Sequence, residues 1–359
     1  MLFSTTRMYN PGDDFVLFGI RRLLEASLGS FVPVVHNRNP ALHALRGLAA
    51  ASAGRTDPAA LGMAELHRAI EGTVPAYDNS WHAGFDMDAV DLAVFAGTPE
   101  WAGTVTAPLA DALLTAGTPT LYLGLGAFEG VGAMGYAEIP KRDRRLLEGA
   151  LLVTVRDEAC AALLAPLSPA LLPCPSLFAA PQPRPRARVR RIALSMQGVG
   201  ERNPQRIERE TFAYAEALFV ALAERFECTL VCHYIDEIAE LRAAFGDGFP
   251  ISYAYDAAEY LEIYDGFDVT VTTRVHGAGL AASLGIPGFL IGHSARAATA
   301  EGFCATILDP NEWSVDAALD LIASYDAAAS KALIAHKEAA REATLGHLRP
   351  ALRDLGFAE

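Results

Sequence analysis

The chain has 359 residues, of which 52% are hydrophobic and 20% are charged, and its formal net charge is −14 at pH 7. This composition supports a full hydrophobic core and excludes extensive disorder, while the negative charge opposes nonspecific binding to nucleic acid or to an anionic membrane surface. Five scattered cysteines without Cys-x-x-Cys spacing indicate neither a disulfide framework nor a zinc site. Because the start lacks a secretory signal pattern and the long apolar stretches are interrupted, we expect a cytoplasmic protein without an integral membrane segment.

In the first half of the chain, β-branched apolar runs alternate with amphipathic or Ala/Leu-rich stretches. The first kind of pattern predicts buried strands, and the second predicts helices. We therefore expect strands near residues 31–35, 91–96, 119–123 and 151–155, and helices near residues 14–28, 59–71, 104–116, 141–149 and 157–165.

A proline- and arginine-rich segment from Pro181 to Arg191 divides the chain. Alternating Pro and Arg cannot form a helix or a central strand, so the segment is typical of a linker. We expect an N-terminal domain over residues 1–178, a linker over 179–190 and a C-terminal domain over 191–359. The overall acidity of the chain favours a solvated connector over a polyanion-binding site.

The second half repeats the alternation of strand and helix patterns. Strands are expected near residues 191–196, 228–233, 250–254, 268–273 and 287–292, and helices near residues 205–225, 235–244, 257–264, 276–285, 314–323 and 327–349. Such alternation predicts α/β architecture with a parallel sheet, covered by helices, in each half. Two such halves joined by a linker would face one another across a cleft.

The most informative segment places Arg274 and His276 between a buried strand and a small-residue helix. Free N–H groups at the start of a helix attract anions, and open α/β sheets bind ligands beyond the carboxyl ends of their strands. Two cationic side chains at such a junction indicate a phosphate or carboxylate ligand. The alternative is that Arg274 pairs with an interdomain carboxylate and that His276 only caps the helix.

Other polar residues also follow predicted strand ends. Each of them alone is typical of a loop or a helix cap, but residues at the carboxyl ends of one parallel sheet come together. This set is His233, Asp236, His293 and Arg296. Gln197, in a glycine-containing loop after another strand, and Gly277, beside the Arg/His pair, are further candidate contacts. For Arg156 and Asp157, which follow a strand of the first half, we expect a structural pair at a helix start.

Three motifs, in this order along the chain, resemble those of the polysaccharide pyruvyl transferase family. They are Asn10-x-Gly12-Asp13 before a helix, the segment from Val153 to Glu158, and Arg274-x-His276 followed by Gly285 and Pro287. The resemblance covers both halves of the chain. It implies a fold like that of the GT-B glycosyltransferases, with two Rossmann-like domains facing each other across a cleft.

The resemblance also implies a chemistry. The donor substrate would be phosphoenolpyruvate, with no further cofactor and no metal, and the acceptor would be a pair of hydroxyls on a sugar or glycan precursor. The product would be a pyruvate ketal of polysaccharide biosynthesis, and phosphate would be released. Arg274 would hold an anionic group of the donor, and His276 would protonate its methylene carbon. Substrate contacts are expected from Asn10, Gly12, Asp13, Gln197, His233, Gly277, His293 and Arg296.

Two other functions fit the same sequence pattern. A GT-B glycosyltransferase would place the diphosphate of a nucleotide sugar against Arg274, and a noncatalytic anion- or glycan-binding protein would hold its ligand without turnover. In the first domain, which is expected to be the acceptor side, Asp13 would orient an acceptor hydroxyl or only cap the helix that follows.

Overall fold

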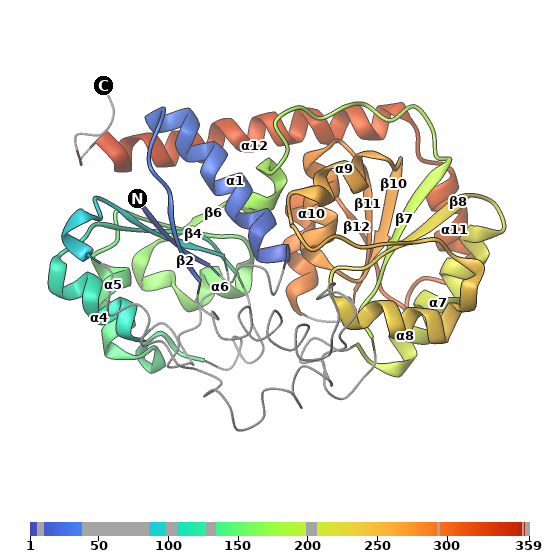
Figure 1. Cartoon of the computed structure of the whole chain (residues 1–359), viewed down its shortest axis with the longest axis horizontal. Coiled ribbons are helices and arrows are strands. Elements are labelled where there is room, and N and C mark those ends of the chain that lie inside the picture. Colours follow the sequence, from blue (N-terminus) through green and yellow to red (C-terminus); the bar gives the residue numbers. More distant parts are fainter. Residues whose placement is uncertain are drawn as a thin grey trace, which may run out of the picture.

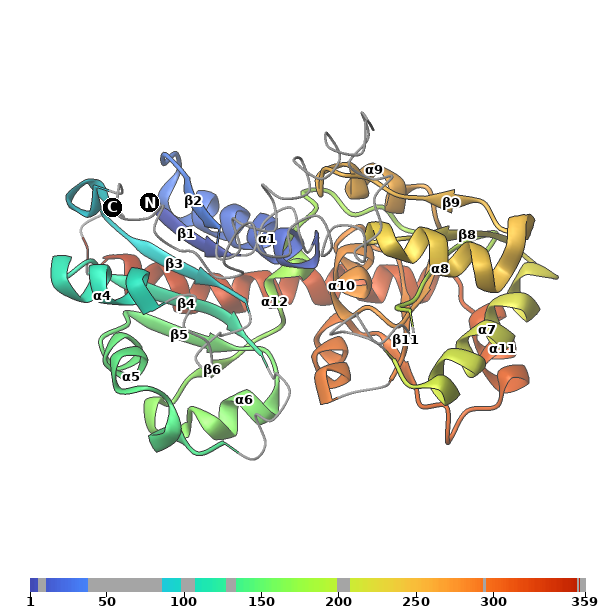
Figure 2. The same cartoon turned by 60° about the horizontal axis from the view of Figure 1, so that its bottom comes forward.

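The computed structural model describes residues 1–5, 11–37, 86–97, 107–126, 134–198, 207–292, 295–353 and 355. The first half of the chain forms a six-stranded sheet of order β2-β1-β3-β4-β5-β6, in which every paired strand is parallel (Figures 1 and 2). Its strands are β1 (Leu2–Thr5), β2 (Val34–Asn37), β3 (Ala93–Ala96), β4 (Thr120–Leu125), β5 (Leu152–Val155) and β6 (Ala170–Leu171).

Helices cover both faces of this first sheet. On one face, Phe3 of β1 packs in a core with α1 (Pro11–Leu28), and on the other, Leu2 packs in a core with α4 (Ala107–Ala116), α5 (Lys141–Glu148) and α6 (Glu158–Leu163). This division follows from the alternation of side chains along a strand. The helix expected near residues 59–71 lies outside the described residues.

The second half forms a second parallel six-stranded sheet, of order β12-β11-β10-β7-β8-β9. Its strands are β7 (Arg191–Ser195), β8 (Glu227–Val231), β9 (Ile251–Ser252), β10 (Val269–Thr272), β11 (Gly288–Ile291) and β12 (Thr306–Leu308). One face packs against α7 (Arg209–Ala223), α8 (Ile235–Phe245) and α11 (Val315–Ala323), and the other packs against α9 (Glu259–Asp265) and α10 (Val275–Ser283). The predicted α/β fold with two Rossmann-like halves is confirmed.

Three strands were not predicted. They are β1, β6 and β12, which contain four, two and three residues. Segments such as Leu2–Thr5 and Ala170–Leu171 do not stand in a β-branched apolar run, whereas the two residues of β9 lie in the apolar segment expected near 250–254. The domain boundaries at residues 178 and 190 stay a prediction. The first sheet ends with β6 before residue 178, and the second sheet begins with β7 after residue 190.

The last helix, α12 (Ala327–Arg353), connects the two halves. Figures 1 and 2 show it running alongside both sheets. Its later leucines, Leu345, Leu348 and Leu352, are fully buried in the core that contains Phe3 of the first sheet. The chain therefore returns to its first half after completing the second sheet. Among the described residues, no helix combines the length and the apolar character needed to cross a membrane.

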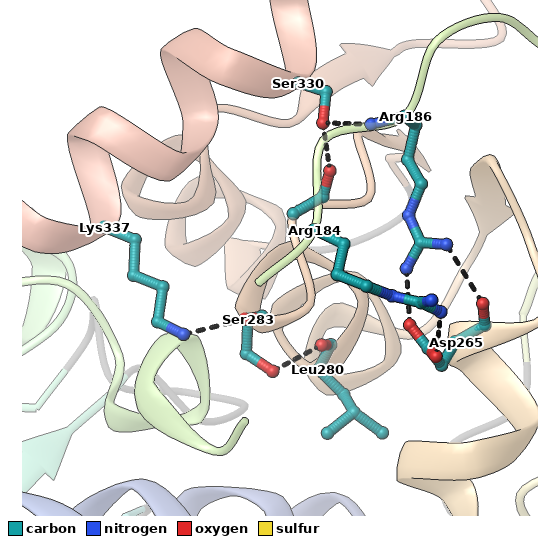
Figure 3. A network of polar contacts seen from close by, with 8 residues as sticks. Arg184, Arg186, Asp265, Leu280, Ser283, Ser330 and Lys337 are labelled. Atoms are coloured by element: carbon teal, nitrogen blue, oxygen red, sulfur yellow. Dashed lines mark hydrogen bonds and ion pairs between the residues drawn. The ribbon is translucent and has the colours of Figure 1, made fainter. Parts of the chain in front are cut away.

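The linker docks on the second half and on α12 (Figure 3). Arg184 and Arg186 both pair with Asp265 at the end of α9. The Arg186 N–H donates to Ser330 Oγ of α12 at 2.9 Å, and Ser330 in turn donates to the Gly285 carbonyl at 2.6 Å. These two linker arginines are therefore occupied by a structural carboxylate.

A short 3-10 helix, η7 (Pro175–Phe178), sits where the two halves meet. It is approached by three glycines, Gly19 of α1, Gly124 of β4 and Gly279 of α10. A Cβ atom on the first two would overlap Pro175, and a Cβ atom on Gly279 would overlap the Ser176 hydroxyl. Only glycine lets these three elements come so close, so η7 is held from both halves.

Candidate functional site

The backbone of the site is the turn from β10 into α10. All four residues of β10 are buried, and α10 begins at Val275 with Arg274 in extended conformation at its N-cap. The Arg274 N–H donates to Thr272 Oγ1 at 2.8 Å, and the first helical bond runs from the Ala278 N–H to the Arg274 carbonyl at 3.1 Å. The N–H groups of the first helical turn have no acceptor within the helix, which makes this end favourable for an anion.

The Arg274 guanidinium is held in place within the second half of the chain. It is 5% exposed, forms an ion pair with Glu237 of α8, and lies 4.2 Å from the centroid of the Tyr234 ring. Glu237 is 1% exposed, and its Oε2 accepts bonds from the N–H groups of His233 at 2.7 Å and Tyr234 at 3.0 Å. One carboxylate partner of Arg274 therefore comes from the same half of the chain.

His276 lies in the first turn of α10 and contacts the other half of the chain. Its Nε2 lies 3.1 Å from Nη1 of Arg156, which follows β5 of the first sheet. Because a guanidinium can only donate, Nε2 must accept, so the imidazole is neutral and carries its proton on Nδ1. Burial, followed by the charges of Arg156 and Arg296, lowers the pKa of His276 well below its ordinary value.

His233 stands behind the start of α10. Its Nε2 lies 2.8 Å from the Tyr264 hydroxyl. Its ring packs edge-on against the ring of Phe15 of α1, with the two ring centroids 5.6 Å apart. Burial, and then the charge of Arg274, lowers the pKa of His233 well below its ordinary value. A Cβ atom on Gly277 would lie 2.9 Å from His233 Cε1 and 3.0 Å from the Tyr264 hydroxyl, so glycine is required for this packing.

Arg296 and Asp13 approach the same cluster from opposite halves. Arg296 belongs to η9 (Ala295–Phe303), and Asp13 lies in the first turn of α1. Burial and the charge of Arg156 lower the pKa of Arg296, while Asp13 acts in the opposite direction. Because α1 begins at Pro11, Asp13 is inside the helix and not at its N-cap.

The other predicted residues are more loosely connected to this cluster. Gln197 follows β7, is 6% exposed, and donates its backbone N–H to Thr273 Oγ1 at 3.0 Å, which ties it to the β10–α10 turn. Gly12 is buried in the first turn of α1. Asn10 and His293 lie outside the described residues.

Asp157 stands at a helix start, as expected, because its Oδ1 accepts the Cys160 N–H of α6 at 2.9 Å. Arg156 also contacts His276 across the interface, a contact that sequence reasoning did not predict. Sequence reasoning also missed Glu237 and Tyr264. Glu237 carries a weak local signal, since it stands at the third position of a helix, where a carboxylate can bond back to the preceding N–H groups. Tyr264 carries none, because its hydroxyl meets His233 only in the folded chain.

The sequence profile of the family described as polysaccharide pyruvyl transferase matches residues 10–295. The chain belongs to this family. It is accordingly a transferase, and the matched range contains every candidate residue named above except Arg296, which follows its last position. A search of curated proteins finds no match.

Solved structures with a similar fold have distant sequences. The UDP-GlcNAc 2-epimerase from Methanocaldococcus jannaschii is 11% identical with a TM-score of 0.52, over 91% of this chain and 93% of the epimerase. S. aureus MnaA, solved with UDP, is 12% identical with a TM-score of 0.50, over 98% and 96% of the two chains. The OtsA apo structure is 15% identical with a TM-score of 0.50, over 99% and 98%. At these identities the likeness concerns the two-domain fold.

Among the described residues of this pyruvyl transferase family member, no group of three or more histidine, cysteine, aspartate or glutamate side chains is placed to hold a metal ion. The groups that do converge include three arginines and two histidines, with Glu237 and Asp13 beside two of the arginines. They are suited to binding a small anion and to transferring a proton beside it.

Proposed function

We propose that this transferase moves the enolpyruvyl group of phosphoenolpyruvate to hydroxyls of a sugar or glycan precursor, forming a pyruvate ketal and releasing phosphate. The observation that carries the proposal is the convergence of Arg156, Arg274 and Arg296 around His276 at the start of α10. This cluster lies in a chain with a net charge of −14, so it is a local reversal of the overall field.

The charge of the cluster suits a small multivalent anion. Glu237 neutralises Arg274 in part, and Asp13 acts on Arg296, while the N–H groups of the first turn of α10 add further donors for an anion. Phosphoenolpyruvate carries a phosphate and a carboxylate a few atoms apart. Guanidinium groups from both halves of the chain would hold these two groups, with Arg274 in a bidentate contact.

The reaction needs a proton on the methylene carbon of the donor. We assign this step to His276. It is neutral beside Arg156, but a bound phosphate would attract the Arg156 guanidinium and favour the charged imidazole. Proton transfer to the methylene carbon would then leave a cationic carbon for the first acceptor hydroxyl. The first hydroxyl would return its proton to His276 as it adds, and phosphate would leave with the electron pair of its C–O bond. The second hydroxyl would then close the ketal and give its proton to the departing phosphate.

Asp13 would orient an acceptor hydroxyl from the α1 side, opposite the donor. We place the reaction in the cytoplasm, on a precursor of the glycan. Gln197 is a candidate contact for an uncharged part of either substrate, since among the described residues its buried side-chain oxygen has no hydrogen-bond partner.

The test is incubation of the purified protein with phosphoenolpyruvate and a panel of nucleotide-linked and lipid-linked sugars. Phosphate release that depends on the acceptor, together with a ketal-bearing product by mass spectrometry, would support the proposal. Reactions without acceptor serve as controls. Nucleotide release from a nucleotide sugar, without consumption of phosphoenolpyruvate, would favour a glycosyltransferase. Binding without any consumption would favour the noncatalytic alternative.

A further inference from the structure

The Arg156 guanidinium is enclosed by close packing. A Cβ atom on Gly126 would overlap its Nε and Cζ, and a Cβ atom on Gly97 would lie 3.9 Å from its Nη1. The same Nη1 lies 3.5 Å from the sulfur of Cys174 and 3.1 Å from Nε2 of His276. The sulfur therefore lies beside a nitrogen that contacts the imidazole.

Cys174 is itself held firmly. It is fully buried, directly precedes η7, and its sulfur accepts a bond from the Ser176 hydroxyl at 3.4 Å. Ser176 is fully buried too, and its hydroxyl packs against Gly279 of α10. Since η7 is fixed by α1, β4 and α10 together, the position of the sulfur is set by both halves of the chain.

We infer that Cys174 is a positioning residue, which directs the Arg156 guanidinium toward His276 and toward the anion of the donor. An arginine side chain has four rotatable bonds, so its guanidinium needs an acceptor as well as packing to keep one orientation. The sulfur supplies one acceptor for Nη1 beside the one that His276 Nε2 provides, and it does not contact the reacting atoms. As far as it concerns the donor, this inference rests on the proposed function.

The groups around His276 come from several elements of the fold. Arg156, which follows β5, and Arg296 of η9 act electrostatically on the imidazole. So do His233, which follows β8, and Arg274 at the N-cap of α10. Asp13 of α1 and Glu237 of α8 act on two of these arginines. Among them, Arg156 is the group whose placement Cys174 controls by direct contact. Displacing its guanidinium should therefore raise the pKa of His276 and weaken donor binding.

The experiment compares Cys174→Ala, which removes the acceptor, with Cys174→Ser, which retains one. Cys228→Ala is the matched control, because Cys228 is also buried but lies on β8 in the other core. We measure KM and kcat with phosphoenolpyruvate, and we titrate His276 by NMR in the ligand-free protein. The second measurement needs no donor.

Cys174→Ala should raise KM for phosphoenolpyruvate about tenfold, as expected for the loss of one weak bond to a charged group, with a smaller change in kcat. It should also raise the pKa of His276. Cys174→Ser should restore both values, while Cys228→Ala should lower the melting temperature and leave both unchanged. If Cys174→Ala does not fold, Ser176→Ala, which releases the sulfur from one side, should shift both values in the same direction by less.

Unchanged KM and unchanged His276 titration in Cys174→Ala would overturn the inference. So would a serine variant as defective as the alanine variant, because the sulfur would then act by its volume alone. A wild-type protein that neither binds nor consumes phosphoenolpyruvate would refute the proposed function instead, and the NMR titration would still decide the role of Cys174.

Discussion

Lys337 is a buried cation at the junction of the two halves, and replacing it should change how stability depends on pH. It is 2% exposed, and its Nζ donates to the carbonyl of Ala180 at 2.7 Å. It also donates to the carbonyl of Ser283, at the end of α10, at 2.8 Å (Figure 3). Burial lowers its pKa from 10.5 to about 8, and Arg22 and Arg341 act in the same direction. We consider Lys337→Met, which retains an unbranched side chain without the charge.

The sign of the effect follows from proton linkage. Between pH 8 and 10.5, the unfolded chain keeps a proton on this lysine while the folded protein has lost it, so the free energy of unfolding rises with pH. A shift from 10.5 to about 8 corresponds to roughly 3 kcal/mol in all, of which about 2 kcal/mol falls between pH 8 and pH 10. The methionine variant should lack this rise.

The assay is urea denaturation of wild type, Lys337→Met and Lys331→Met at several pH values from about 7 to 10, under otherwise identical conditions. Lys331 is the control, because it is an exposed lysine of the same helix. The difference in unfolding free energy between wild type and Lys337→Met should grow with pH in favour of wild type, and Lys331→Met should follow wild type. A constant difference would show that Lys337 keeps an ordinary pKa, and the reasoning from its burial would then be wrong.

Three further predictions concern the start of α10. Phosphoenolpyruvate should raise the melting temperature of wild type, and Arg274→Lys should reduce that shift, because an ammonium cannot form the bidentate contact; an equal shift in both proteins would remove Arg274 as the anion clamp. His276→Gln should lower kcat by roughly 100-fold with a much smaller change in KM, and equal modest losses in both would assign the acid to another group. The lowered pKa of His276 also means that wild type loses stability as pH falls below 6.5, and acid denaturation should affect the Gln variant less. Gly277→Ala should weaken donor binding, because its Cβ would meet His233 and Tyr264. The control is Gly346→Ala, which has open space around its Cβ and should stabilise α12 by up to about 1 kcal/mol. Equal donor affinity in the two variants would contradict the packing argument.

The sequence by itself was sufficient for features that depend on neighbouring residues. The period of apolar side chains predicted the two parallel sheets and most of their helices, because a strand or helix shows its buried face within a few residues. The junction at Arg274 and His276 was recognisable for the same reason, since a strand end, an N-cap and a helix start are adjacent in the chain. The segments of β1 and β6 offered no such period, and they are strands because neighbouring strands pair with them.

The tertiary structure alone decided which residues complete the site. Arg156 and His276 are separated by 120 positions, and their contact depends on how the two halves are held together by η7 and α12. The identity of Glu237 as the partner of Arg274 depends on the packing of α8 against the β10–α10 turn. Cys174 and Lys337 follow the same rule: as isolated residues they are an ordinary thiol and an ordinary lysine, and their surroundings arise only when segments far apart in the chain pack against each other. Local patterns carry no information on such distances, because side-chain packing sets them only once the elements assemble.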